Sequence, residues 1–141
     1  MRVLDTNVLS ELIRPRPEPS VVAWVRAQPG PSLFITAIAQ AEMLYGVAIL
    51  PPSRRRDDLA EAVRALFEVD LAGRVLPFDG EAASHFAHIA AGRRAAGRPI
   101  SQLDAQIAAI ARSRGAGVAT RNVADFVDCG VDVVDPWTWP A

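Results

Sequence analysis

The sequence predicts an α/β protein: a three-layer α/β/α sandwich with a mainly parallel central sheet, in a single domain over residues 1–141. Short apolar runs alternate with longer stretches whose apolar residues recur at helical spacing, a pattern typical of parallel strands joined by crossover helices. Half of the 141 residues are hydrophobic, which is enough to build one sound core. We see neither an internal repeat nor a linker.

Three kinds of signal place the elements along the chain. Strands are expected at short runs of apolar and β-branched residues. Helices are expected where apolar residues recur every three to four positions, after a serine that can cap the first turn and before prolines or glycines. In chain order the signals predict strand 3–4, a helix carrying residues 8–13, helix 20–28 capped by Ser20, strand 33–36, helix 37–50, helix 53–69 capped by Ser53, a proline-marked edge strand over 75–78, helix 81–96, helix 101–114 capped by Ser101, and strands 118–120 and 131–134.

The charge balance argues against a uniformly basic protein that coats nucleic acid, because the net charge is −1. All 15 basic residues are arginines, whose guanidinium groups pair well with phosphate. We interpret the run 54–56 as a solvated helix start. Four other arginines are candidates for binding a substrate phosphate: Arg93, Arg94, Arg98 and Arg121.

The apolar runs, the cysteine and the histidines of the chain indicate where the protein is located and whether it can bind zinc. No apolar run is long enough for a membrane span and no charged-then-apolar leader precedes the first strand, so we expect a cytoplasmic protein. Cys129 is the only cysteine and is expected to be a small buried apolar residue. His85 and His88 could bind zinc with Glu81, but a solvated or interface helix face is the favoured interpretation because the chain has no third histidine.

Three carboxylates stand at positions that suggest chemistry. Asp5 ends the first expected strand, which is where α/β proteins place ligands. Asp5, and Asn7 in the same turn, either cap the next helix or bind a ligand. Glu42 has apolar residues three and four positions away, so it needs a cation, a hydrogen bond or a metal unless the helix turns it to solvent. Asp104 also faces apolar neighbours, although its spacing from Ser101 fits a capping box.

A fourth polar cluster follows the strand expected at 118–120. It consists of Thr120, Arg121, Asn122 and Asp125, and forms either a turn or part of a site. Because the carboxyl ends of parallel strands meet at one edge of a sheet, we expect one shared site. Oxygen-only ligands suit Mg²⁺ or Mn²⁺, which activates water against phosphodiesters. The expected catalytic residues are Asp5, Glu42, Asp104, Asn122 and Asp125.

Four blocks of the sequence together resemble the PIN-domain family: VLDTNVLSEL, AEMLYGV, LDAQIAAIA and VATRNVADF. Within that family the likeness is to VapC toxins, the ribonucleases of toxin–antitoxin pairs. The RPRP, VVAW and terminal PW segments point further to the FitB-like subgroup. The resemblance implies that Asp5, Glu42 and Asp104 hold the metal. It also implies support from Thr6 and Asn7, which Thr120 is expected to join.

The chain departs from the subgroup at the fourth acid. The position after Thr-Arg is often Asp in the subgroup and is Asn122 here, with Asp125 as the only nearby acid. The resemblance nevertheless implies a Mg²⁺- or Mn²⁺-dependent endoribonuclease toxin. Such a toxin forms a homodimer, is neutralised by a cognate antitoxin encoded nearby, and meets DNA only through that antitoxin.

The sequence leaves two alternatives to the ribonuclease. The first is a non-catalytic PIN-fold partner in a DNA-binding regulatory complex, which would have no reason to hold a divalent metal. The second is a phosphatase with Asp5 as nucleophile. It is disfavoured because residue 7 is Asn and the chain has no Lys to hold the phosphate.

Overall fold

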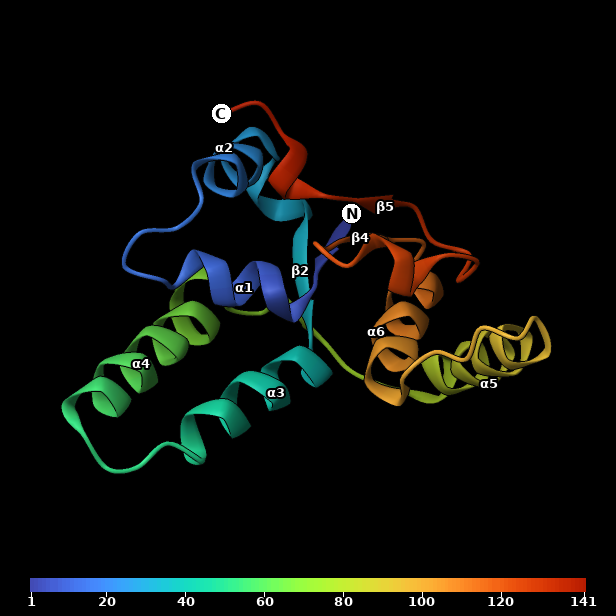
Figure 1. The fold of residues 1–141 in the computed structure, drawn as a ribbon, viewed down its shortest axis with the longest axis horizontal. Coiled ribbons are helices and arrows are strands. Elements are labelled where there is room, and N and C mark those ends of the chain that lie inside the picture. Colours follow the sequence, from blue (N-terminus) through green and yellow to red (C-terminus); the bar gives the residue numbers. More distant parts are fainter.

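The computed structural model describes residues 1–141 and contains a five-stranded sheet in which every strand pair is parallel (Figure 1). The strand order is β3-β2-β1-β4-β5, with β1 at the centre. Val3 of β1 pairs with Phe34 on one side and with Val118 on the other. The strands are β1 (Arg2–Leu4), β2 (Leu33–Thr36), β3 (Val75–Leu76), β4 (Gly117–Ala119) and β5 (Val133–Val134).

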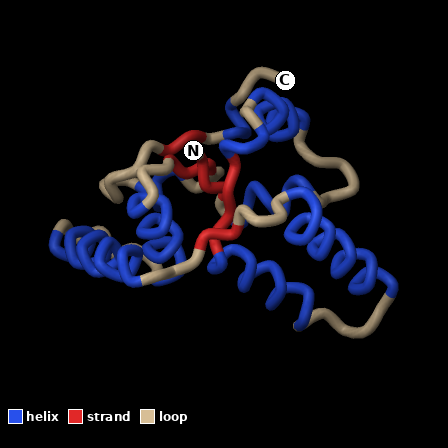
Figure 2. Tube along the Cα trace, turned by 180° about the vertical axis from the view of Figure 1, so that it is seen from behind, coloured by secondary structure: helices blue, strands red, loops and turns tan.

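Six α-helices cover the two faces of the sheet, and viewed from behind the strands lie between the helices (Figure 2). Alternate residues of a strand face opposite layers: Leu4 belongs to an apolar cluster with α1–α4, whereas Val3 belongs to one with α5 and α6. This confirms the predicted sandwich. The helices are α1 (Thr6–Leu12), α2 (Pro19–Ala27), α3 (Ala37–Ala48), α4 (Arg54–Ala65), α5 (Gly80–Ala95) and α6 (Gln102–Ser113).

The predicted order of elements is confirmed, with differences at their ends. Ser53 and Ser101 cap α4 and α6 through their side chains, as expected. Ser20 does not cap α2, because Pro19 already occupies its first position, where a proline loses no helical hydrogen bond. The helix expected to reach residue 69 ends its regular part at Ala65 and continues as a π-helical turn over Leu66–Asp70.

Two strands, β3 and β5, are shorter than the sequence suggested, and β4 begins and ends one residue earlier than predicted. β3 lies at the sheet edge as predicted but ends before Pro77. β4 ends at Ala119, so Thr120 begins the following turn. Cys129 is buried, as expected. None of the helices combines the length and apolar character needed to cross a bilayer.

Candidate active site

Asp5 both caps α1 and faces a polar centre. Its carboxylate accepts hydrogen bonds from the Thr6 backbone N–H (2.8 Å), the Thr120 hydroxyl (2.8 Å) and the Asn7 side-chain amide (3.3 Å). Burial raises the pKa of Asp5 above its ordinary value, and the first two of these bonds oppose that rise. The charges of Asp104 and Glu42 raise the pKa further, so both of these carboxylates lie within electrostatic reach of Asp5.

Asn7 and Thr120 join the end of β1 to the turn after β4. The Asn7 amide donates to the Thr120 hydroxyl oxygen (3.2 Å), and its carbonyl accepts from the Arg121 backbone N–H (3.2 Å). The Thr120 oxygen also accepts from the Asn122 N–H (3.0 Å), and Thr120 is fully buried. These bonds set the position of the β4 turn relative to Asp5.

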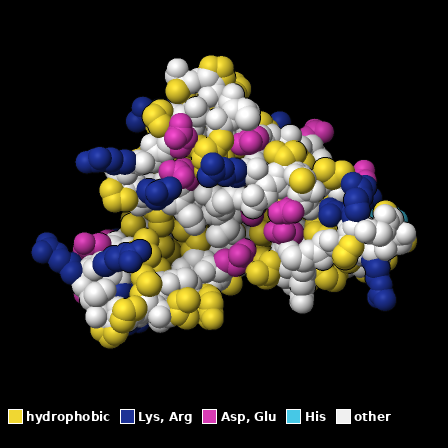
Figure 3. Space-filling view, viewed as in Figure 1, with side chains coloured by type: hydrophobic (Ala, Val, Ile, Leu, Met, Phe, Trp, Pro, Cys, Tyr) yellow, Lys and Arg dark blue, Asp and Glu magenta, His cyan; other side chains and the backbone are white.

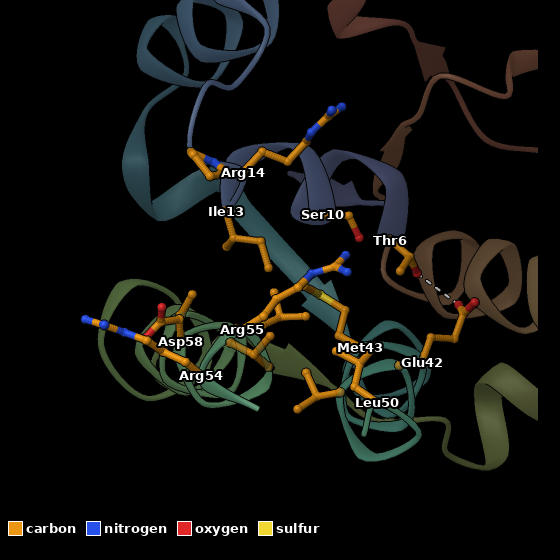
Figure 4. Close-up of a pocket in the computed structure, with 16 residues that line it drawn as sticks. Thr6, Ser10, Ile13, Arg14, Glu42, Met43, Leu50, Arg54, Arg55 and Asp58 are labelled. Carbon is orange, nitrogen blue, oxygen red and sulfur yellow. Dashed lines mark hydrogen bonds between the residues drawn. The ribbon is translucent and has the colours of Figure 1, made fainter. Parts of the chain in front are cut away.

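Glu42 approaches Asp5 from α3. The Thr6 hydroxyl donates to its carboxylate over 2.9 Å (Figure 4). The expectation of an apolar helix face around Glu42 is only partly right: Ala39 is fully buried, but Tyr45 is 67% exposed. Glu42 itself is half-buried, so its carboxylate lies at the border of the core rather than within it.

Asp104 lies in the first turn of α6, where its backbone N–H donates to the Ser101 hydroxyl oxygen (3.2 Å). Ser101 is therefore the cap, and the reciprocal bond of a capping box, from the Ser101 N–H to the Asp104 carboxylate, is not formed. Partial burial raises the pKa of Asp104, a hydrogen bond with the Ser101 side chain lowers it, and the charge of Asp125 raises it.

One cavity of about 460 Å³ brings most of the predicted residues together. Asp125 does not line it; its side chain is exposed on the short 3₁₀ turn Val123–Phe126. Four lining residues were not predicted: Ser10, Glu11, Arg14 and Trp137. Positions 7, 10 and 11 share a face of α1, which is a signal that could have found Ser10 and Glu11. The lining residues are Asp5, Thr6, Asn7, Ser10, Glu11, Arg14, Glu42, Asp104, Arg121, Asn122 and Trp137.

The donor chemistry of this cavity fits a hard divalent cation. All of its candidate ligands are oxygens, and a bound cation would relieve the repulsion from Asp104 and Glu42 that adds to the effect of burial on the pKa of Asp5. In the present side-chain positions no three acidic, histidine or cysteine side chains are close enough to ligate one ion. Thr120 and Thr6 hydrogen-bond the carboxylates of Asp5 and Glu42 instead.

Arg93 has a different role from the substrate contact that the sequence suggested. Its side chain is buried, and its guanidinium donates to the backbone carbonyls of Arg98 (2.7 Å), Asp125 (2.9 Å) and Val127 (3.0 Å). It also contacts the Cys129 sulfur at 3.7 Å. A guanidinium used in this way is not available to a phosphate, so Arg93 ties α5 to the segment that follows β4.

The other three candidate arginines differ in their relation to the cavity. Arg98 forms an ion pair with Asp128, and Arg94 is exposed on α5. Neither lines the acidic cavity, whereas Arg121 does. The sequence could not separate these residues because all four are arginines near glycines or helix ends.

A larger groove of about 780 Å³ adjoins the acidic cavity and lies between α1, α3 and α4. The two spaces share Thr6, Ser10, Arg14 and Glu42. Figure 4 shows the Arg55 guanidinium extending into the groove, and Arg54 and Arg55 are exposed at the start of α4, as predicted. In the space-filling view, acidic side chains gather near the centre of this face beside a hydrophobic hollow (Figure 3). The apolar lining includes Ile13, Met43, Val47, Leu50 and Leu59.

Comparisons with known proteins agree with this arrangement. The PIN domain model matches residues 2–128. The chain is 40% identical over 137 residues to VapC ribonuclease Y4jK of Sinorhizobium fredii, covering 97% of this chain and 98% of that protein. It is 37% identical to toxin FitB of Neisseria gonorrhoeae, covering 97% and 99%. A chain in the structure of FitAB bound to an IR36 DNA fragment superposes with a TM-score of 0.91 at 37% identity, covering 100% and 99%. The chain therefore belongs to the PIN-domain family.

Proposed function

We propose that the protein is a Mg²⁺- or Mn²⁺-dependent endoribonuclease that acts as the toxin of a toxin–antitoxin pair. The observation that carries this proposal is the convergence of Asp5, Glu42 and Asp104 on one cavity from the end of β1, from α3 and from α6. The names of two relatives, a VapC ribonuclease and a toxin, support it.

In the proposed mechanism Asp5, Glu42 and Asp104 hold the metal, directly or through water, and Asn122 adds a neutral oxygen. A divalent ion held by these residues would supply an activated water and would neutralise charge on the phosphate. Thr120 and Thr6 orient the carboxylates of Asp5 and Glu42. Hydrolysis by water leaves a 5′-phosphate and a 3′-hydroxyl on the products.

Total cellular RNA tests the proposal directly. The purified chain should cut RNA in Mg²⁺ or Mn²⁺ and stop cutting in EDTA, and the mapped ends should carry 5′-phosphates. Equal cleavage in EDTA, or ends with cyclic phosphates, would contradict the mechanism. The absence of both cleavage and Mn²⁺ binding would favour the alternative, a non-catalytic partner in a DNA-binding complex; a similar chain was solved in a complex with DNA.

We further propose that the cognate antitoxin, encoded nearby, binds in the groove between α1, α3 and α4 and carries any contact with DNA. The lining of this groove is apolar along one side, and Glu42 belongs to both the groove and the acidic cavity. An antitoxin arginine at this junction would pair with Glu42 or Asp104 as a substitute for the metal. Co-expression of the neighbouring small protein should protect cells from this chain, and failure to protect would remove the toxin role while leaving the nuclease chemistry intact.

A homodimer is expected through the outer face of α3. Leu44, Tyr45 and Ile49 are 51%, 67% and 63% exposed, and such an apolar surface usually marks an interface. Leu66, which follows α4, is buried in the core and does not belong to this surface. Light scattering at tens of micromolar should give a dimer for the wild type and a monomer for Tyr45→Glu. The control Val69→Glu, at a site 66% exposed outside α3, should remain dimeric. A wild-type monomer would contradict the expectation.

Asn122→Asp should tighten Mn²⁺ binding by roughly tenfold, because a carboxylate adds charge where a neutral amide now lines the cavity. Calorimetric titration measures the change. Asp125→Asn is the matched control, since Asp125 is exposed and outside the cavity, and it should leave the affinity unaltered. An unchanged affinity in Asn122→Asp with a loss in Asp125→Asn would move the fourth ligand to Asp125.

A further inference from the structure

The acidic cavity contains two cations of its own, Arg14 and Arg121. Its other charged lining residues are all acidic: Asp5, Glu11, Glu42 and Asp104. A phosphodiester that enters such a cavity is repelled by the carboxylates unless positive charge also meets it. These two arginines are therefore the groups in the cavity whose chemistry suits a phosphate.

Arg121 is fixed in relation to the carboxylates. Its guanidinium carbon lies 5.1 Å from the centre of the Trp137 ring, within the range of a cation–π contact. Its backbone N–H donates to Asn7, whose amide also donates to Asp5. Trp137 is itself held, because its backbone N–H donates to the Asp135 carboxylate (2.9 Å) and its side chain packs against the apolar cluster of α1–α4.

The Arg121 guanidinium is free to bind an anion. It takes part in none of the five ion pairs of the structure, and Arg121 is exposed. Contact with the face of an indole leaves the N–H groups at the guanidinium edge available for a phosphate. Arg121 lines the acidic cavity, which an arginine that only packed on a surface tryptophan would not need to do.

Arg14 lies farther from Asp5 along the same cavity. Asp5 is the N-cap of α1, whose seven residues span about 10 Å at 1.5 Å per residue, and Arg14 lies two residues beyond the end of that helix. Arg14 pairs with Glu11 at 3.3 Å, but its side chain is 66% exposed. The cavity thus runs from acids at one end of α1 to a cation at the other.

We propose that Arg121, positioned by Trp137, and Arg14 bind successive phosphates of a single-stranded RNA on one side of the scissile bond. The proposal rests on the proposed ribonuclease function and adds the path of the substrate. Arg121 binds the phosphate nearer to the acids, and Arg14 binds one farther along the strand.

Fluorescence anisotropy with a fluorescein-labelled unstructured RNA 12-mer, in EDTA, tests the path without any need for cleavage. Arg121→Gln should weaken binding about five- to tenfold at low salt and reduce the slope of log K against log salt by about 0.7, the value for one single-strand phosphate contact. Arg14→Gln should act in the same direction. Arg26→Gln, the same charge change at an exposed position of α2 outside the cavity, should leave both quantities unaltered.

Two variants of Trp137 distinguish positioning from plain stability. Trp137→Phe keeps an aromatic face and should retain most of the affinity. Trp137→Leu should lose as much affinity as Arg121→Gln, although the charge of Arg121 remains. In metal-dependent cleavage, Arg121→Gln should raise KM with little change in kcat, since the contact acts on ground state and transition state alike.

Equal effects of Arg121→Gln and Arg26→Gln would overturn the phosphate path while leaving the nuclease standing. Wild-type chain that binds no RNA at 50 mM salt in EDTA would also overturn it, because the arginine contacts do not depend on a metal. Failure of the ribonuclease proposal is seen separately, as the absence of metal-dependent cleavage. The two failures are therefore distinguishable.

Discussion

Asp104→Asn is expected to abolish metal-dependent RNA cleavage while the protein stays folded and becomes no less stable. The amide keeps an oxygen for the Ser101 hydroxyl but removes the charge that would hold the cation. Asp5→Asn and Glu42→Gln should abolish cleavage in the same way. Asn also serves well as a helix N-cap, so the start of α1 survives the change at Asp5.

The stability of Asp104→Asn should depend on pH with a definite sign. Partial burial raises the pKa of Asp104 above its ordinary 3.8, so the folded state binds the proton more tightly than the unfolded chain does. That contribution to stability is present below the unfolded pKa and is lost as the pH rises through the higher folded pKa. In urea unfolding, the stability of the variant relative to the wild type should therefore increase between pH 4 and pH 7.

The exposed Asp57 of α4 supplies a control for the charge change itself. Asp57→Asn should keep both activity and stability. If Asp104→Asn instead retains full activity and unfolds more easily by about 1 kcal/mol, Asp104 is a helix-capping residue and not a ligand. That result would end the idea of a shared site.

Local sequence signals were sufficient for the elements and for the acids. Short apolar runs locate strands because a parallel strand is buried on both faces, as Val3 and Leu4 of β1 are here, each in a different apolar cluster. Once the strands are parallel, their carboxyl ends meet at one edge, and Asp5 and Thr120 come into hydrogen-bonding contact although 115 residues separate them. The topology, and not the local motif, brings the two residues together.

Contacts made late in the chain escaped the sequence analysis. Trp137 reaches the cavity because the short turn Pro136–Thr138 packs on α2, and nothing in its local sequence signals that packing. Arg93 looked like one solvated arginine among several, yet its carbonyl partners at Asp125 and Val127 lie 32 and 34 residues away. Hydrogen bonds between such distant segments leave no periodic pattern in the sequence.

The burial of Arg93 leads to the largest expected loss of stability. Arg93→Met should lower the free energy of unfolding by about 3 kcal/mol, because three partly buried backbone carbonyls lose their donor and each such hydrogen bond contributes about 1 kcal/mol. The free energy of unfolding of Arg93→Lys should lie between those of the wild type and Arg93→Met, since an ammonium keeps the charge but cannot span all three carbonyls as a planar guanidinium does.

Arg94 is the matched control, one position along the same helix and exposed. Arg94→Met should change the unfolding free energy by no more than about 0.5 kcal/mol, as is usual for surface sites. Urea unfolding of the pair isolates the buried hydrogen bonds from the charge and from helix propensity, which the two substitutions share. Equal stabilities would show that the carbonyls do not depend on Arg93. A loss of RNA affinity in Arg93→Met without any loss of stability would restore Arg93 to the substrate-binding surface, because only a guanidinium that reaches solvent can act on the RNA without acting on the fold.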